Sequence, residues 1–173
     1  AKINIEIIRN VWSGSKKLET KIIHCFNGKK LWYSKKYLED DLIYLKNSGH
    51  FRGASELIDA GINIVEKKYK DTDYTIVLAS DTWLIKPNYL EKVLEKMESE
   101  NKYLASCPWG LPKRNDLRDV GMAVDFFVIN SKLAKKYKMF PVDYEDFFSK
   151  YSDLFFYQYT GPLCQTVLKG LNS

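Results

Sequence analysis

Three oxygen-bearing side chains, Ser80, Asp81 and Thr82, directly follow the apolar run TIVLA at residues 75–79. An apolar run without alternation is typical of a strand that is covered on both faces, as in the middle of a parallel sheet. Open α/β sheets bind ligands beyond the carboxyl ends of such strands, where a carboxylate can hold a divalent cation and, through it, a phosphate. The alternative is that Asp81 and Thr82 only begin a turn or cap the next helix.

Two glycines bracket a cation earlier in the chain. Gly49 and Gly53 flank the tripeptide that ends in Arg52, just before a predicted helix at 54–69. Gly53 would let the backbone come close to another group, and Arg52 would bring a fixed positive charge there. The alternative is that Gly49 is an ordinary helix stop and that Arg52 is a surface charge.

A loop with a rigid start and a charged end follows the predicted strand at 103–107. It contains Pro108, Trp109 and Gly110, and then a run of charged residues over 113–119. Its composition is unsuited to a core, so we expect it to form part of an active or binding site beside the sheet.

Strand and helix signals alternate along the chain, which predicts an α/β fold: a three-layer sandwich with a mostly parallel central sheet, in which late strands can run antiparallel. Asn27-Gly28 is a turn signal that either closes a hairpin with 31–33 or leads into a helix. Asp125 interrupts the longest strand, and a buried acid there would need a partner or a role. The expected strands are 3–8, 21–26, 75–79, 103–107 and 121–129, and the expected helices are 35–45, 54–69, 87–97, 131–137, 143–148 and 162–168.

Length and composition favour one domain over 1–173, since 173 residues with 45% hydrophobic content can bury one substantial core. The formal net charge of +5 comes from scattered lysines, so we expect no nucleic-acid partner. The three cysteines have no CxxC spacing and lie in apolar surroundings, as is typical of reduced core residues in a cytoplasmic protein. No run approaches the ~20 apolar residues of a transmembrane segment.

Three segments, in this order, resemble the nucleotide-sugar glycosyltransferases of the GT-A fold, most closely the family 2-like group. NSGHFRGASELIDAGI (47–62) resembles the N-x-G-x-x-x-G-A segment that precedes a helix. DYTIVLASDTWLIKPNYLEKVLEKM (73–97) is similar to the strand, DxD-type element and following helix. GMAVDFFVINSKLAKKYKMFPVDYEDFF (121–148) resembles the glycine-led strand, helix and late Glu-Asp pair. The chain departs from the D-x-D pattern, because Ala79 stands at the first acid position.

The resemblance implies a nucleotide-diphosphate sugar as donor, a glycan or lipid-linked acceptor, and transfer with inversion. It implies that Asp81 contacts a divalent cation, Mg²⁺ or Mn²⁺, or the diphosphate. Asp146 would be the base that takes the proton of the acceptor hydroxyl, with Asp143 and Glu145 as neighbours that raise its pKa. The chain is short for this group, which leaves open whether part of the acceptor site is absent, is supplied by a second subunit of a homo-oligomer, or is built from loops. The implied donor-binding residues are Arg52, Gly53, Ser80, Asp81, Trp109 and Gly110.

Two other functions compete with sugar transfer. The first keeps the fold but removes catalysis, which leaves a degenerate protein that binds a nucleotide sugar or a glycan. The second is a nucleotidyltransferase, a class that usually carries a glycine-rich phosphate loop near its first strand. The sequence Ser13-Gly14-Ser15 is too short to be such a loop.

Overall fold

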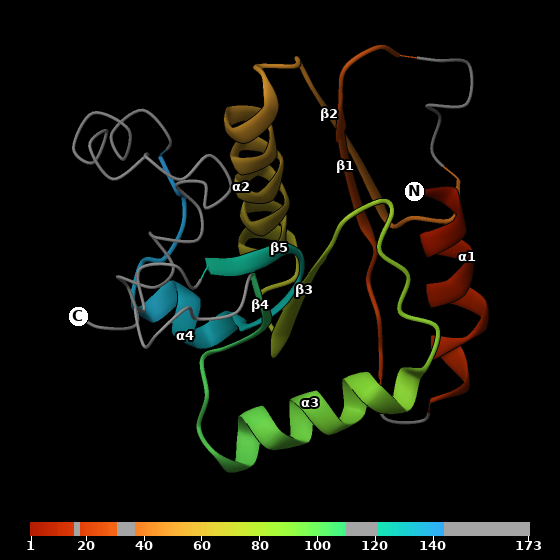
Figure 1. The fold of residues 1–173 in the computed structure, drawn as a ribbon, viewed down its shortest axis with the longest axis vertical. Coiled ribbons are helices and arrows are strands. Elements are labelled where there is room, and N and C mark those ends of the chain that lie inside the picture. The colour runs from red at the N-terminus through yellow and green to blue at the C-terminus, as the bar shows by residue number, and fades with distance from the viewer. Residues whose placement is uncertain (16–17, 31–36, 110–120, 144–173) are drawn as a thin grey trace.

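The computed structural model describes residues 1–15, 18–30, 37–109 and 121–143, and these form a mixed α/β fold (Figure 1). The predicted α/β class is therefore confirmed. The elements are α1 (Lys2–Asn10), η1 (Trp12–Gly14), β1 (Ile23–Asn27), β2 (Asp41–Leu45), α2 (His50–Lys68), β3 (Tyr74–Leu78), α3 (Pro87–Ser99), β4 (Leu104–Trp109), β5 (Gly121–Asn130) and α4 (Ser131–Lys136).

The described strands form two small sheets. β1 and β2 pair in parallel, whereas β5 lies between β3 and β4 and is antiparallel to both. The apolar run at 75–79, which forms most of β3, therefore lies at the edge of an antiparallel sheet and not in the middle of a parallel one. α2 returns the chain from the carboxyl end of β2 to the start of β3, so β1, β2 and β3 run toward the same end of the molecule (Figure 1).

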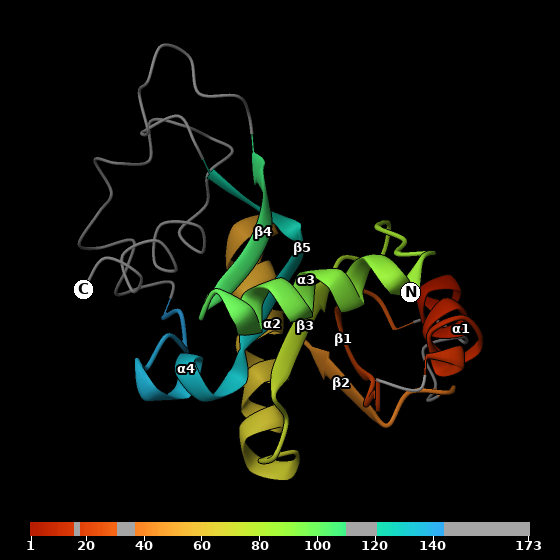
Figure 2. The same cartoon turned by 90° about the horizontal axis from the view of Figure 1, so that it is seen from below.

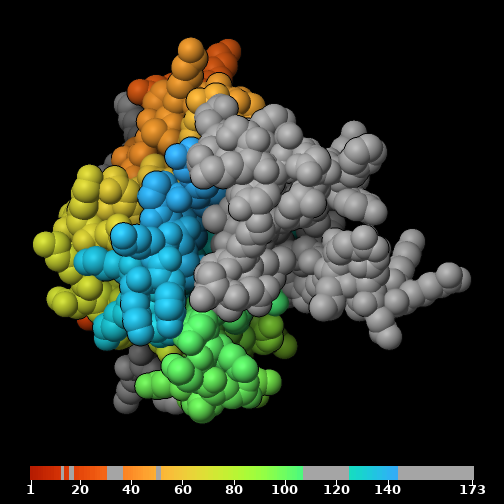
Figure 3. Space-filling model, turned by 90° about the vertical axis from the view of Figure 1, so that its left-hand side faces the viewer, coloured from red at the N-terminus to blue at the C-terminus, as the bar shows by residue number. Residues whose placement is uncertain are grey.

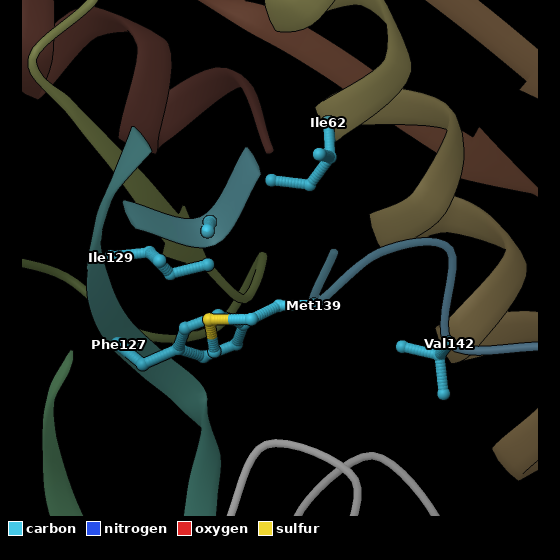
Figure 4. Packing of buried hydrophobic residues seen from close by; sticks show 6 residues of the cluster. Ile62, Phe127, Ile129, Met139 and Val142 are labelled. Atoms are coloured by element: carbon cyan, nitrogen blue, oxygen red, sulfur yellow. The ribbon is translucent and has the colours of Figure 1, made fainter. Parts of the chain in front are cut away.

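β5 contributes to the core on both of its faces, because alternate residues of a strand point in opposite directions. Phe127 and Ile129 pack toward α2 and α4 in one buried cluster (Figure 4). Val128 packs with Trp12, Leu90 and Met97 in a second cluster, which joins η1 and α3 to the opposite face. α3 crosses in front of the antiparallel sheet when the molecule is seen from below (Figure 2). The first cluster consists of Ile62, Phe127, Ile129, Ala134, Met139 and Val142.

The expected first strand at 3–8 is wrong, since these residues form α1. Ile5 is buried, and Ile8 packs against the second cluster beside Trp12, so the apolar residues recur at helical spacing. Arg9, in the last turn, holds the helix to the chain before β2, with Nη2 2.7 Å from Oδ2 of Asp40. These contacts override the strand preference of the isoleucines.

The expected helix at 35–45 is also wrong where the structure describes it, because 41–45 is β2. The acids that indicated an exposed helix face each have a partner. Buried Glu39 accepts the main-chain N–H of Tyr37 at 3.0 Å, Asp40 accepts that of Ile22 at 2.7 Å, and Asp41 pairs with Lys68 at 2.7 Å. The hairpin alternative involved 31–33, which lie outside the described residues.

The remaining elements follow the prediction more closely. The expected strands at 21–26, 103–107 and 121–129 are β1, β4 and β5, and α2 begins at His50 instead of at 54. Asn130 caps α4, with Oδ1 accepting the N–H of Leu133 at 3.1 Å. The expectation of a buried Asp125 is wrong: this residue is exposed, just beyond the stretch of β5 that pairs with β3.

Two predicted helices lie mostly or wholly outside the residues that the structure describes. Of the expected helix at 143–148, only Asp143 is described; it has a φ of 42° and lies outside any helix. The expected helix at 162–168 lies entirely outside the described residues. Among the helices that the structure describes, none is long and apolar enough to cross a membrane.

Leu90 tests the second cluster, because its side chain is 0% exposed. Replacing it in Leu90→Ala should lower the free energy of unfolding by about 3 kcal/mol, from lost burial and an unfilled cavity. The neighbouring Tyr89 is 49% exposed, so Tyr89→Ala should change the same quantity by no more than about 0.5 kcal/mol. Urea denaturation measures both variants, and equal losses would show that α3 does not pack as described.

A histidine and a buried carboxylate lie together where β1 and β2 begin to pair. Nδ1 of His24 is 3.8 Å from Oε1 of Glu39, whose side chain is 0% exposed. Burial lowers the pKa of His24 below 6.5, although the charge of Glu39 opposes the shift. The fold therefore favours the neutral imidazole. As the pH falls below 6.5, the unfolded chain binds a proton at His24 before the folded chain does, so stability decreases.

His24→Gln removes this titrating ring, so its free energy of unfolding should fall less steeply below pH 6.5 than that of the parent. Urea unfolding above and below that pH measures the slope. Glu19→Gln is a suitable control, because the Glu19 side chain is 88% exposed, and it should keep the parent's slope. Identical slopes in the parent and in His24→Gln would contradict the assignment.

Candidate functional site

A pocket of about 430 Å³ opens where β1 and β2 end and α2 begins. This is the upper end of the molecule in Figure 1, where the chain turns from β2 into α2. Ligands of α/β proteins commonly bind beyond the carboxyl ends of parallel strands, and the volume suits a small molecule. The pocket is lined by Asn27, Asn47, Gly49, Ala54 and Leu57.

The first turn of α2 gives this pocket a positive character. The turn contains no acidic residue, and the N-cap is Gly49, which makes no side-chain cap hydrogen bond. Gly49 has a φ of 102°, a conformation that favours glycine, and its own N–H is taken by Oδ1 of Asn47 at 3.0 Å. The helix dipole therefore favours an anion at this end.

Gly53 lets α2 approach β1 closely, as the sequence predicted. A Cβ atom at Gly53 would lie 2.7 Å from Nδ2 of Asn27 and 3.6 Å from Oδ1 of Asn47. The groups that approach Gly53 are thus the two amide side chains that line the pocket. Asn27 was interpreted only as a turn residue in the sequence. Its position directly after an apolar strand was the signal that could have identified it.

Arg52 lies in the same turn but contacts its own helix. Its Nε is 2.9 Å from Oε1 of Glu56. The other carboxylate oxygen of Glu56, Oε2, accepts a hydrogen bond from the Ser48 hydroxyl at 2.7 Å. The hydrogen bonds from Ser48 and Arg52 lower the pKa of Glu56. Arg52 is not among the residues that line the pocket, so its contact with a phosphate stays a prediction.

The turn after β3 carries Ser80 and Asp81, and both are exposed. α1 and η1 hold this turn from the side: Nδ2 of Asn4 donates to the carbonyl of Ala79, and Nε1 of Trp12 donates to that of Leu84, each at 2.9 Å. Asp81 follows the carboxyl end of β3, as predicted. β3 runs in the same sense as β1 and β2 (Figure 1).

The described residues contain no group of three or more His, Cys, Asp or Glu side chains that could hold a metal ion. Asp81 alone could still be one ligand of Mg²⁺, which often binds through one carboxylate together with phosphate oxygens and water. A cation at Asp81 would then depend on a bound diphosphate for its remaining ligands.

The structure describes the predicted acidic group only at its first member. Asp143 is exposed and directly follows Val142, whose N–H donates to Oδ1 of Asp59 on α2 at 2.8 Å. Glu145 and Asp146 lie outside the described residues. Asp59 was not predicted as a functional residue, since an acid in the middle of a helix is usually on the surface; its only signal was its place beside the apolar Ile58.

The predicted loop residues are described only in part. Trp109 is the last residue of β4 and pairs with Gly121 of β5. Its side chain and the whole of Gly110 lie outside what the structure describes, so their contacts with a donor stay predictions.

No family model, curated protein or solved structure matches the chain.

Gly53→Ala tests the close approach of α2 to the pocket amides. The new Cβ would lie 2.7 Å from Nδ2 of Asn27, so the Asn27 side chain should rotate and its side-chain amide NMR signals should move. Alanine favours a helix, so the free energy of unfolding should change by less than about 1 kcal/mol.

Gly14→Ala is the matched control for this change, because a Cβ atom there would meet nothing within 4 Å. It should leave the Asn27 signals where they are in the parent. Unchanged Asn27 signals in Gly53→Ala would show that the two groups are not in contact.

Proposed function

We propose that the protein is a nucleotide-sugar glycosyltransferase that binds the nucleoside diphosphate of its donor in the pocket at the start of α2. The observation that carries the proposal is the composition of that pocket. Three of its lining residues, Asn47, Gly49 and Ala54, belong to the segment that resembles the N-x-G-x-x-x-G-A element of the GT-A family 2-like group. The anion-attracting turn of α2 suits a diphosphate, and the amides of Asn27 and Asn47 suit the polar edge of a base or ribose.

The direction of the strands supports the finer GT-A arrangement, which we include in the proposal. β1, β2 and β3 run in the same sense, so the turn that carries Asp81 and the pocket each follow the carboxyl end of a strand (Figure 1). Helices cover β5 on both faces, as a three-layer sandwich requires.

The proposed reaction joins an acceptor oxygen to the anomeric carbon of the donor sugar. The bond between that carbon and the diphosphate oxygen breaks, and its electron pair leaves with the nucleoside diphosphate. Asp146 takes the acceptor proton, with Asp143 and Glu145 nearby in sequence. The N-terminal end of the α2 dipole and the Asp81 turn stabilise the leaving diphosphate. A bound Mg²⁺ or Mn²⁺ would neutralise part of its charge.

A nucleotide-sugar binding protein without catalysis is the second candidate, and one observation favours it. Ala79 replaces the first acid of the D-x-D pattern, and both of its main-chain polar groups are already bonded, to Asp125 and Asn4. The proposed cation site thus has one carboxylate instead of two, which weakens the compensation of the diphosphate charge.

Thermal unfolding with UDP, GDP and dTDP, each with and without Mn²⁺, tests the binding site. At about a hundredfold Kd, the matching nucleotide should raise Tm by about 5 °C or more. Asp81→Asn should remove the part of the shift that depends on Mn²⁺ and keep the rest. Asp71→Asn, an equal change at an exposed residue in the turn between α2 and β3, should behave as the parent does.

Equal shifts in the parent and in Asp81→Asn would remove Asp81 from the site, and the absence of any shift would refute the proposal. The hydrolysis of nucleotide sugars then separates the two candidates. Turnover of the matching sugar identifies a transferase, whereas saturable binding without turnover identifies the binding protein.

A further inference from the structure

A half-buried carboxylate in α2 lies outside the pocket and holds a different part of the chain. Oδ1 of Asp59 accepts the main-chain N–H of Val142 across 2.8 Å. Val142 is 4% exposed, and it belongs to the same buried cluster as Ile62 and Met139 (Figure 4). The segment 139–143 is therefore fastened to α2 by apolar side chains and by a hydrogen bond to its main chain.

The segment 139–143 leads from α4 along the side of α2. Figures 1 and 3 show it beside α2, rising from α4 toward the end where the pocket opens. Asp143 follows the fastened Val142 directly, and its charge acts on Asp59. The chain then continues to Glu145 and Asp146, the acids that the proposed reaction assigns to the acceptor.

α2 thus connects the two halves of the proposed reaction. Ala54 and Leu57 form part of the pocket wall, and Asp59 lies only two residues further along the same helix. A helix is a stiff element, so a group fastened at Asp59 keeps a nearly constant position relative to that wall. A donor in the pocket and Asp143, which directly follows Val142, would therefore be held by the same helix.

An asparagine side chain could accept the same hydrogen bond without a charge, so the presence of an ionisable side chain at position 59 needs an explanation. Burial raises the pKa of Asp59 above 3.8; the hydrogen bond from Val142 opposes this shift, and the charges of Asp143 and Glu56 add to it. The ionised form is thus disfavoured at this position. When Asp59 is ionised, however, its carboxylate accepts a charge-assisted hydrogen bond, which is about twice as strong as a neutral one.

We propose that Asp59 is a positioning residue whose carboxylate holds the Val142 peptide, and with it Asp143 at the end of the segment 139–143, against the helix that forms the pocket wall. The inference rests on the proposed function, because it assigns the segment to the acceptor side of sugar transfer. Asp59 acts through the segment and does not itself touch the substrate.

Amide hydrogen exchange of the full chain tests the contact without reference to activity. Asp59→Leu removes the acceptor, Asp59→Asn keeps an uncharged acceptor, and Glu66→Gln removes an exposed charge from the same helix. The Val142 amide should exchange about tenfold faster or more in Asp59→Leu, because a hydrogen bond to a charged group is lost. Asp59→Asn should retain most of the protection and Glu66→Gln all of it. Parent-like exchange in Asp59→Leu overturns the proposal.

A titration keeps the test decisive if Asp59→Leu does not fold. In the parent, the NMR shift of the Val142 amide proton should follow the ionisation of Asp59, with a midpoint above 3.8. The same step should be absent in Asp59→Asn, which keeps the shape of the side chain. A Val142 signal that does not titrate in the parent overturns the proposal.

Kinetics with the nucleotide sugar of the best-stabilising nucleotide test the positioning role. Asp59→Leu should lower kcat about tenfold and leave the donor KM unchanged, and Asp59→Asn should recover most of the loss. Equal damage to kcat and donor KM would overturn the role, because it would mean that the pocket itself is disturbed. If the parent has no turnover, the proposed function fails, and the exchange results still decide whether Asp59 holds the segment.

Discussion

The close seating of α2 on β1 is the constraint on which the described site depends. Two glycines on this helix allow it: a Cβ at Gly53 would meet Asn27 at 2.7 Å, and a Cβ at Gly61 would meet Sγ of Cys25 at 3.3 Å. Larger side chains would move the helix away from the strand. Contact at both points brings the start of α2 and the ends of β1 and β2 together. Burial in this contact also raises the pKa of the Cys25 thiol to about 11, so the thiol stays protonated.

Local patterns predicted those elements whose own residues determine them. β3 and β5 have long apolar runs, α3 begins with a proline and repeats its apolar face, and α4 has an asparagine cap. α1 and β2 were mispredicted because partners distant in sequence determine them. Ile7 and Ile8 of α1 pack against a cluster that contains Leu90, Met97 and Val128, and Asn4 donates to the carbonyl of Ala79. Around β2, Asp40 pairs with Arg9, Asp41 pairs with Lys68, and Glu39 is buried.

The site shows the same division between local and distant determinants. Asn47, Gly49 and Ala54 follow one another in a short segment, so a sequence pattern could identify them, and the structure brings them to one pocket. Asn27 follows an apolar strand, which marks it as a candidate, but its place beside Asn47 depends on the pairing of β1 with β2. Asp59 looks like a surface acid until the chain returns more than eighty residues later to donate the Val142 N–H. The roles of Glu145 and Asp146 stay predictions.

The support that α1 and η1 give to the turn after β3 has a consequence for engineering. Asn4 and Trp12 are buried at 7% and 3% exposure, and neither lines the pocket, yet both donate hydrogen bonds to the backbone around Asp81. Variation at these two positions would alter the stiffness of that turn while every lining residue stays the same. A library that aims to change the preference of the proposed donor site would therefore include this remote pair.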